Sequence, residues 1–192
     1  MEEIVPIKIT KDMKVKELVE SMAGLGFQAG KLGEAACLFQ EIIKDKEIKL
    51  FLGIAGAMIP AGMKNIIFDL LDNTSIFVST GANLTHDLIE ALGEKHYKGN
   101  ENANDWELNK KGIDRMYDVF MKQEVYVKLE KFFSDNWEEL SKAKTIKELL
   151  WKIGSLIENK ESILRKCYDK KIPVFCPALA DSGIGLMIWG NK

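Results

Sequence analysis

Apolar and polar positions form two kinds of block along this chain. Residues 49–54, 75–80 and 172–176 are short apolar runs bounded by turn-forming residues, a pattern typical of buried strands. Residues 28–44 instead repeat apolar side chains at helical spacing and form a wide apolar face, which suits packing on a sheet. We predict further helices at residues 10–22, 61–71, 83–92, 124–141, 145–157 and 161–170, and another from Ser182 onward.

Strands that alternate with helices indicate an α/β fold, here a Rossmann-like parallel sheet with flanking helices. Three strands leave open edges, whereas parallel sheets are normally covered on both faces. We therefore expect the chain to be part of a larger sheet. Residues 94–112 are polar and turn-rich, which predicts a surface excursion within a single domain, 1–192, that includes a helical N-terminal region, 1–47.

Composition narrows the functional classes. The chain has 192 residues and a formal net charge of −2, with both signs scattered, so no nucleic-acid face is expected. No apolar run approaches the roughly 18 residues of a membrane span. The acidic N-terminus lacks the basic start of a signal peptide. Three widely spaced cysteines fit reduced thiols in a cytoplasmic protein, and none is paired at metal-ligand spacing.

The segment 78–87 combines a strand end, a small-residue turn and a helix start. Gly81 and Ala82 clear the space after the strand, and Asn83 is a suitable N-cap for the following helix. Asp87 would then lie near the first helical turn. Backbone N–H groups and the positive end of the helix dipole would point at one spot, which favours an anionic cofactor.

Four stretches of the chain also carry a family resemblance. Residues 78–93 contain the sequence STGANLTHDLIEALG, and residues 51–63 read FLGIAGAMIPAGM. GIDRMYD follows at 112–118, and IPVFCPAL at 172–179 is followed by Asp181 and Ser182. Taken in their order along the chain, these stretches resemble deoxyhypusine synthase, most of all its archaeal and bacterial branch. The resemblance covers most of residues 50–189.

The resemblance implies an enzyme that oxidises spermidine with NAD and transfers its aminobutyl group to one lysine of the hypusine-containing translation factor. It also implies an oligomer, because family enzymes form tetramers that share active sites between subunits. The fold would be the N-terminal half of the larger family domain. No metal ion is implied.

Several residues receive roles from this resemblance. Gly56 and Ala57 stand where eukaryotic members carry a Ser-Asn pair, so only backbone contacts with the cofactor remain there. Plain turn formation would also explain the glycines after the first strand and the small residues at 80–82, and an N-cap would explain Asp181. The expected cofactor-binding residues are Gly56, Ala57, Met58, Ile59, Pro60, Thr80, Gly81, Ala82 and Asp181.

His86 is the candidate catalytic residue, and Thr85 and His86 are the candidate substrate-binding residues. A histidine near a helix N-terminus is held neutral and could accept a proton from an amine or polarise a substrate group. Eukaryotic members have Glu at this position, and a purely structural histidine is the alternative. His96 is expected to be a surface or packing residue. Leu186 replaces a polyamine-binding aspartate of eukaryotic members, so the amine is not fixed by the resemblance.

The family's imine-forming lysine lies in a Trp-Gly-Lys motif of the C-terminal half. The ending Trp189-Gly190-Asn191-Lys192 imitates this motif but has an extra Asn and comes too soon after Asp181. We therefore expect the lysine to come from a missing or separate C-terminal-half polypeptide. A non-catalytic paralogue that regulates a full-length synthase, and a homospermidine synthase-like transferase, remain alternatives.

Overall fold

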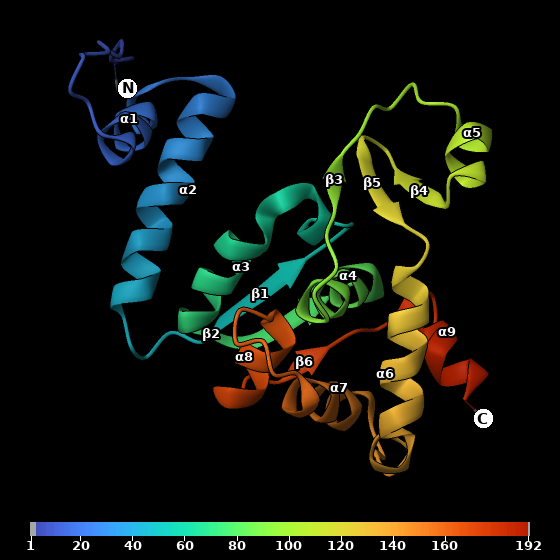
Figure 1. Ribbon diagram of the computed structural model, residues 1–192. Coiled ribbons are helices and arrows are strands. Elements are labelled where there is room, and N and C mark those ends of the chain that lie inside the picture. The colour runs from blue at the N-terminus through green and yellow to red at the C-terminus, as the bar shows by residue number, and fades with distance from the viewer. Residues whose placement is uncertain (1–2, 192) are drawn as a thin grey trace. The chain divides into compact units, whose positions relative to one another are not determined.

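The computed structural model describes residues 3–191 and divides the chain into two compact units, Met1–Leu50 and Phe51–Lys192 (Figure 1). The predicted helical region 1–47 falls inside the first unit. Each unit is described by itself. The single-domain organisation stays a prediction, and Lys192 lies outside the described residues.

The first unit consists of α1 (Val15–Ser21), the short 3-10 turn η1 (Met22–Gly24) and α2 (Phe27–Lys44). The first helix begins at Val15, later than the predicted residue 10; its N-cap is Lys14, whose backbone N–H donates a hydrogen bond to the Glu17 carboxylate at 2.9 Å. Gln40 of α2 donates a hydrogen bond to Glu20 of α1 at 3.1 Å.

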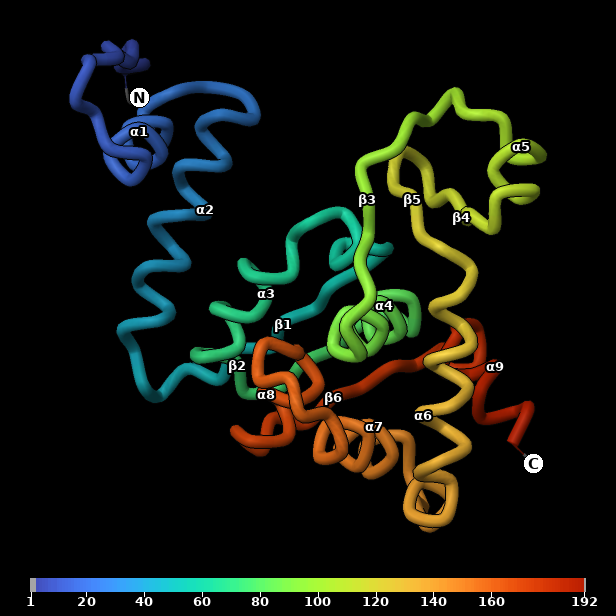
Figure 2. The backbone as a smooth tube through the Cα atoms, viewed as in Figure 1, coloured from blue at the N-terminus to red at the C-terminus, as the bar shows by residue number. Residues whose placement is uncertain are grey.

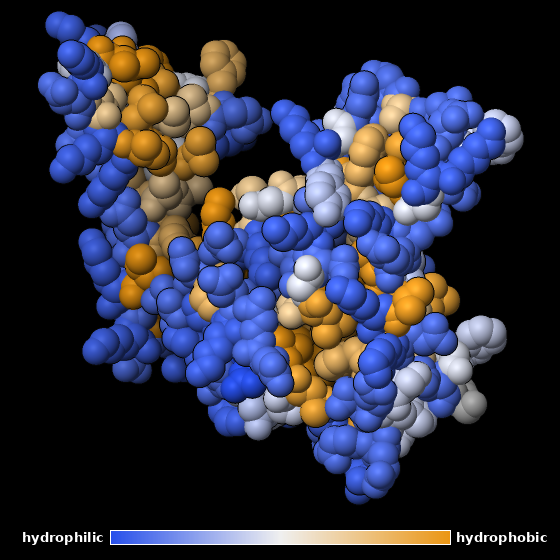
Figure 3. Space-filling model, viewed as in Figure 1, coloured by the Kyte–Doolittle hydropathy of each residue, from blue (hydrophilic) through white to orange (hydrophobic). Residues whose placement is uncertain are grey.

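The first unit exposes much apolar surface, which Figure 3 shows as hydrophobic residues gathered over α1 and the start of α2. Phe27 is 97% exposed. Fully exposed aromatic side chains are costly in water, so this surface is suited to contact with another surface. The other exposed large apolar residues of the unit are Ile4, Val5, Ile9, Val15, Leu32, Leu38, Ile43 and Ile48.

The second unit contains the predicted sheet. Its order is β1 (Leu50–Ile54), β2 (Thr74–Ser79) and β6 (Val174–Phe175). Strands β2 and β6 run parallel, with Phe77 opposite Val174. The predicted α/β class is confirmed, and the tube in Figure 2 follows the chain through helices between these strands.

Helix α4 (Gly81–Ala91) is the central helix of this unit. It contacts α6 (Val125–Leu140), α8 (Ile163–Asp169) and α9 (Gly183–Gly190). Its residues Leu84 and Leu88 are fully buried in the main core. The remaining helical elements are the π-type turn η2 (Ile59–Met63), α3 (Lys64–Leu70), η3 (Leu71–Asn73), α5 (Asp105–Lys110) and α7 (Ile146–Leu156).

A second, antiparallel sheet was not predicted from the sequence. It consists of β3 (Tyr97–Lys98), β5 (Val119–Lys122) and β4 (Ile113–Met116), in that order. These strands are only two to four residues long, too short for a period-2 pattern to emerge. The turn between β4 and β5 lacks glycine and instead places Tyr117 at a φ of 58°, so the usual hairpin signal is absent.

Asp87 links α4 to the beginning of α8. The carboxylate is fully buried and accepts hydrogen bonds from the Ser162 hydroxyl at 2.7 Å and from the backbone N–H groups of Ile163 and Leu164, both at 2.9 Å. Burial raises the pKa of Asp87, while these hydrogen bonds and the nearby Lys64 act in the opposite direction. Asp87 therefore supplies acceptors to N–H groups that the helix itself cannot satisfy.

No helix within residues 3–191 is long and apolar enough to cross a membrane.

We expect Asp87→Ala to lower the free energy of unfolding by about 3 kcal/mol, because it leaves buried donors of α8 without an acceptor. Urea unfolding followed by tryptophan fluorescence measures the change. Asp135→Ala is the matched control, since this aspartate is exposed and pairs with Lys131 one turn away on α6; it should cost about 0.5 kcal/mol or less. Equal effects of the two substitutions would show that the buried contacts of Asp87 do not stabilise the unit.

Candidate functional site

A cavity of about 720 Å³ lies where the three parallel strands end. The last residues of β1 and β2 line it, as does the loop that follows β6. Carboxyl ends of parallel strands are the usual ligand site of open α/β sheets. The lining residues are Gly53, Ile54, Ala55, Gly56, Ala57, Val78, Ser79, Thr80, Gly81, Ala82, Pro177, Ala178 and Asp181.

Thr80, rather than the predicted Asn83, is the N-cap of α4. Its hydroxyl accepts a hydrogen bond from the Asn83 backbone N–H at 3.2 Å and donates one to the Gly56 carbonyl at 2.7 Å. Helix α4 therefore begins at Gly81, two residues earlier than expected. One hydroxyl fixes both the start of this helix and the loop after β1. Gly56 has a φ of 61°, which glycine adopts without strain.

Asn83 is buried and fastens the same loop. Its side-chain oxygen accepts from the Ile59 N–H at 3.1 Å, and its side-chain nitrogen donates to the Ala55 carbonyl at 3.4 Å. The prediction of a cap failed because a cap is a local interaction, whereas this side chain satisfies groups more than twenty residues away.

Gly81 has a structural reason to be glycine. A Cβ at this position would collide with the side chain of Ser182, which caps α9. The loop after β6 thus approaches the start of α4 closely. The backbone N–H groups of Gly81 and Ala82 donate no hydrogen bond to any residue of the described chain. Both residues line the cavity, so donors of the helix N-terminus are available there.

Ser79 supplies a polar atom without a partner. The residue is 4% exposed, and its hydroxyl forms no hydrogen bond with any residue between 3 and 191. Unpaired buried hydroxyls are rare, because burial without a hydrogen bond costs free energy. Ser79 lines the same cavity, so a ligand there could satisfy it. The sequence did not single out this residue.

The other residues predicted to bind the cofactor fall into two groups, one that lines the cavity and one that does not. Asp181 is exposed and lines the cavity, and Ser182 rather than Asp181 caps α9. Ile59 and Pro60 are buried, and Met58 is 40% exposed, but none of these three lines the cavity. The structure therefore gathers Gly56, Ala57, Thr80, Gly81, Ala82 and Asp181 around one space.

His86 is buried, at 7% exposure, and lies in the second turn of α4 rather than in an exposed first turn. Burial and the neighbouring His96 lower the pKa of His86 to about 4, so it is neutral at physiological pH. Thr85 is also buried, and its hydroxyl accepts a hydrogen bond from the Ile184 N–H of α9 at 3.1 Å. The two candidate substrate-binding residues therefore have different partners, Thr85 the backbone of α9 and His86 the ring of His96.

His86 belongs to a chain of polar contacts. Its Nδ1 lies 2.8 Å from Nε2 of His96, and Nδ1 of His96 lies 2.9 Å from Oε1 of Glu90. The other oxygen of Glu90 pairs with Lys64 at 3.0 Å. Burial opposes ionisation of Glu90, but the contacts with His96 and Lys64 outweigh it and lower its pKa. His96, expected to be a surface or packing residue, instead links His86 to Glu90 through hydrogen bonds.

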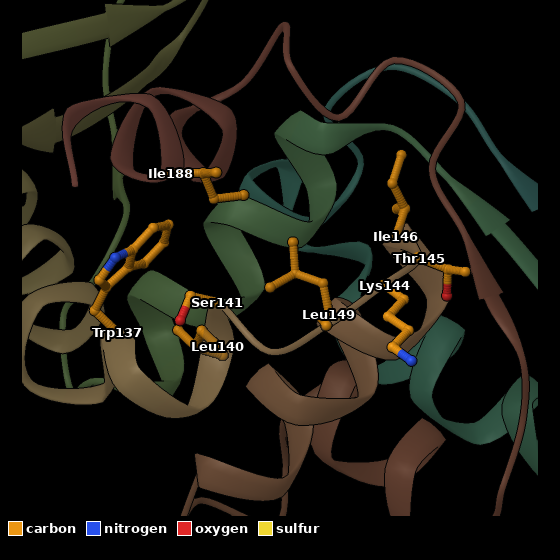
Figure 4. A pocket seen from close by; sticks show the side chains of 9 residues that line it. Trp137, Leu140, Ser141, Lys144, Thr145, Ile146, Leu149 and Ile188 are labelled. Carbon is orange, nitrogen blue, oxygen red and sulfur yellow. The ribbon is translucent and has the colours of Figure 1, made fainter. Parts of the chain in front are cut away.

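A second hollow, of about 340 Å³, lies among α6, α7 and α9. Figure 4 shows Trp137, Leu149 and Ile188 extending into it from three different helices. Lys144 is the one ionisable residue of the lining, so this hollow lacks paired groups for proton transfer. Among the described residues no group of three His, Cys, Asp or Glu side chains is placed to hold a metal ion.

Comparisons with known proteins agree on one family. Residues 17–192 match the family model described as deoxyhypusine synthase. The chain is 43% identical over 188 residues to "Probable deoxyhypusine synthase 1" of Methanosarcina acetivorans, with 96% of this chain and 59% of that protein covered. It is 41% identical over 181 residues to "Probable deoxyhypusine synthase 1" of Archaeoglobus fulgidus, with 93% and 60% covered.

The fold agrees with a solved structure. A "putative deoxyhypusine synthase" of Entamoeba histolytica superposes with a TM-score of 0.64 at 21% identity, covering 94% of this chain and 64% of the other. The chain spans about three fifths of the length of these relatives. With a family model matched over most of its length and archaeal relatives above 40% identity, the chain belongs to the deoxyhypusine synthase family.

Proposed function

We propose that this chain provides the NAD-binding part of a deoxyhypusine synthase-type aminobutyltransferase in the cytoplasm. The assembled enzyme would transfer the aminobutyl group of spermidine to a lysine of the hypusine-containing translation factor. A C-terminal-half polypeptide or a homologous synthase subunit would supply the imine-forming lysine. The observation that carries the proposal is the cavity at the strand ends, lined by six of the nine residues assigned to the cofactor.

The residues of this cavity fit a dinucleotide. The free N–H groups of Gly81 and Ala82 suit a phosphate, because the N-terminus of α4 also carries the positive end of the helix dipole. The unpaired hydroxyl of Ser79 suits a polar group of the ligand. Asp181 is placed as an acceptor for ribose hydroxyls at a strand end. When bound, NAD would accept a hydride from the carbon beside an amine nitrogen.

The chain's own part in the reaction is to bind and orient. Thr80 and Asn83 hold the loop after β1 against the start of α4, so these bonds fix two walls of the cavity relative to each other. His86 is neutral and can accept a hydrogen bond from an amine. Met58, Ile59 and Pro60 would support the cofactor loop from outside the cavity.

NAD binding tests the cavity. Ala82→Glu places a bulky anionic side chain beside the expected phosphate site, so it should weaken NAD binding at least tenfold, as judged by calorimetry of the chain with its partner polypeptide. Ala35→Glu adds the same charge to an exposed position of α2 and should leave the affinity unchanged. Equal affinities of the two variants would place NAD elsewhere and overturn the proposal.

Loss of His86 should slow the reaction. We expect His86→Ala to lower turnover of the assembled enzyme by about 10²-fold, the lower range for a group that handles a proton. Burial and the contact with His96 mean that stability will fall as well. His86→Gln, which keeps a polar side chain, therefore accompanies it, and circular dichroism verifies folding. Full turnover in a folded His86→Ala enzyme would exclude this role.

Association is expected for the purified chain. The first unit exposes nine large apolar side chains, and apolar surfaces of this kind often mark protein–protein interaction sites. Light scattering should therefore report an oligomer, and Phe27→Ser should shift it toward smaller species. A stable monomer at all concentrations, unaltered by Phe27→Ser, would contradict this expectation.

A further inference from the structure

The contacts around His86 define which of its nitrogens carries the proton. The Glu90 carboxylate can only accept hydrogen bonds, so Nδ1 of His96, 2.9 Å away, must be the donor. When both imidazoles are neutral, Nε2 of His96 is bare and can only accept. That nitrogen lies 2.8 Å from Nδ1 of His86, so Nδ1 of His86 carries the proton.

The remaining nitrogen of His86 is left as an acceptor. No residue in the described part of the chain forms a hydrogen bond with its Nε2. The ring is 7% exposed, and its Nε2 is not among the fully enclosed atoms without a partner. Nε2 is therefore without a partner in the described chain and not fully enclosed, and a bare imidazole nitrogen can accept a hydrogen bond from a donor such as an amine.

Lys64 pairs with the second oxygen of the Glu90 carboxylate. Its ammonium lies 3.0 Å from Oε2 of Glu90 and 3.7 Å from Oδ1 of Asp87. The two oxygens of Glu90 are thus divided, one for Lys64 and one for His96. Side-chain exposures of 13% for Lys64, 24% for Glu90 and 6% for His96 shield these contacts from water, which strengthens them.

We infer that Glu90 and His96 are positioning residues, which hold His86 with its proton on Nδ1 and present Nε2 as the acceptor for an amine ligand. This inference rests on the proposed function for the amine alone. The arrangement of protons follows from the contacts themselves. It has the logic of a catalytic triad, in which a carboxylate fixes the tautomer of a histidine, extended here by a second histidine.

The chain contains two histidines, so ¹⁵N-histidine labelling reports on His86 and His96 alone. Long-range ¹H–¹⁵N spectra of the full chain at pH 8 distinguish a protonated ring nitrogen from a bare one. We expect His86 with a protonated Nδ1 and a bare Nε2. A protonated Nε2 on His86 in the wild-type chain would overturn the inference.

Glu90→Gln is the decisive variant, because it should exchange the protonated and bare nitrogens of both histidines. Lys64 can only donate, so it will take the amide oxygen and leave the amide NH₂ facing His96. Nδ1 of His96 must then accept, its proton moves to Nε2, and His86 becomes the Nε2–H form. Glu94→Gln removes the same charge from a residue that pairs with Lys128 and should leave the tautomer of His86 unchanged. An unchanged tautomer in Glu90→Gln would also overturn the inference.

His96→Phe provides a variant of similar ring shape without a hydrogen bond. His86 should then populate both tautomers, whereas retention of the pure Nδ1–H form would show that His96 does not determine it. Spermidine added to the chain with its partner polypeptide separates the inference from the proposed function. It should shift the Nε2 signal of wild-type His86 and bind at least tenfold more weakly to Glu90→Gln.

Failure of the positioning inference and failure of the proposed amine function would give different spectra. If the tautomers follow the scheme and spermidine leaves the Nε2 signal unmoved, the positioning role of Glu90 and His96 stands, and the amine function proposed above is wrong. If spermidine moves the signal while the tautomer does not respond to Glu90→Gln, the positioning role is wrong.

Discussion

The second unit depends on polar side chains at the N-cap and in the first two turns of α4, of which Asn83, Thr85 and Asp87 are buried. Thr80 and Asn83 satisfy backbone groups of the loop after β1, Thr85 satisfies the Ile184 N–H of α9, and Asp87 satisfies the N-terminal N–H groups of α8. Buried N–H groups at helix starts need such acceptors. One helix therefore aligns three other segments, and each would lose its anchor if the matching side chain were removed.

This constraint also shapes the cavity. The loop after β1 and the loop after β6 reach the same helix start, the first through Thr80 and Asn83, the second through the close approach of Ser182 to Gly81. Because both loops are fixed to α4, the strand ends enclose a space of about 720 Å³. The Ser79 hydroxyl and the N–H groups of the helix start have no partner within the described chain and are available to a ligand.

His86 stands between two anchoring residues, Thr85 and Asp87, and differs from both. Its Nδ1 contact leads to His96 and then to the Glu90–Lys64 pair, and its second nitrogen has no partner within the described chain. Side chains that anchor other segments thus flank a histidine whose contacts lead to other ionisable side chains. A helix already immobilised by its neighbours gives such a histidine a fixed orientation, which is what a positioned acceptor requires.

The sequence by itself determined the α/β class, the three parallel strands and most helices, because hydrophobic period and strand length are local properties. It also determined the family, through motifs such as STGANLTHD. Three features needed the tertiary structure: Thr80 rather than Asn83 as the cap, the second sheet of very short strands, and the burial of His86.

The second sheet was missed because its strands are only two to four residues long, and the other two features depend on contacts that a local pattern does not record. A side chain that satisfies a backbone group twenty or seventy residues away, as Asn83 and Asp87 do, leaves no periodic trace in the sequence. The contact between His86 and His96 spans only ten residues, yet it depends on the turn after α4 bringing one ring onto the other. Local pattern determined which elements form, and long-range hydrogen bonding decided which polar side chains anchor the fold and which remain available for chemistry.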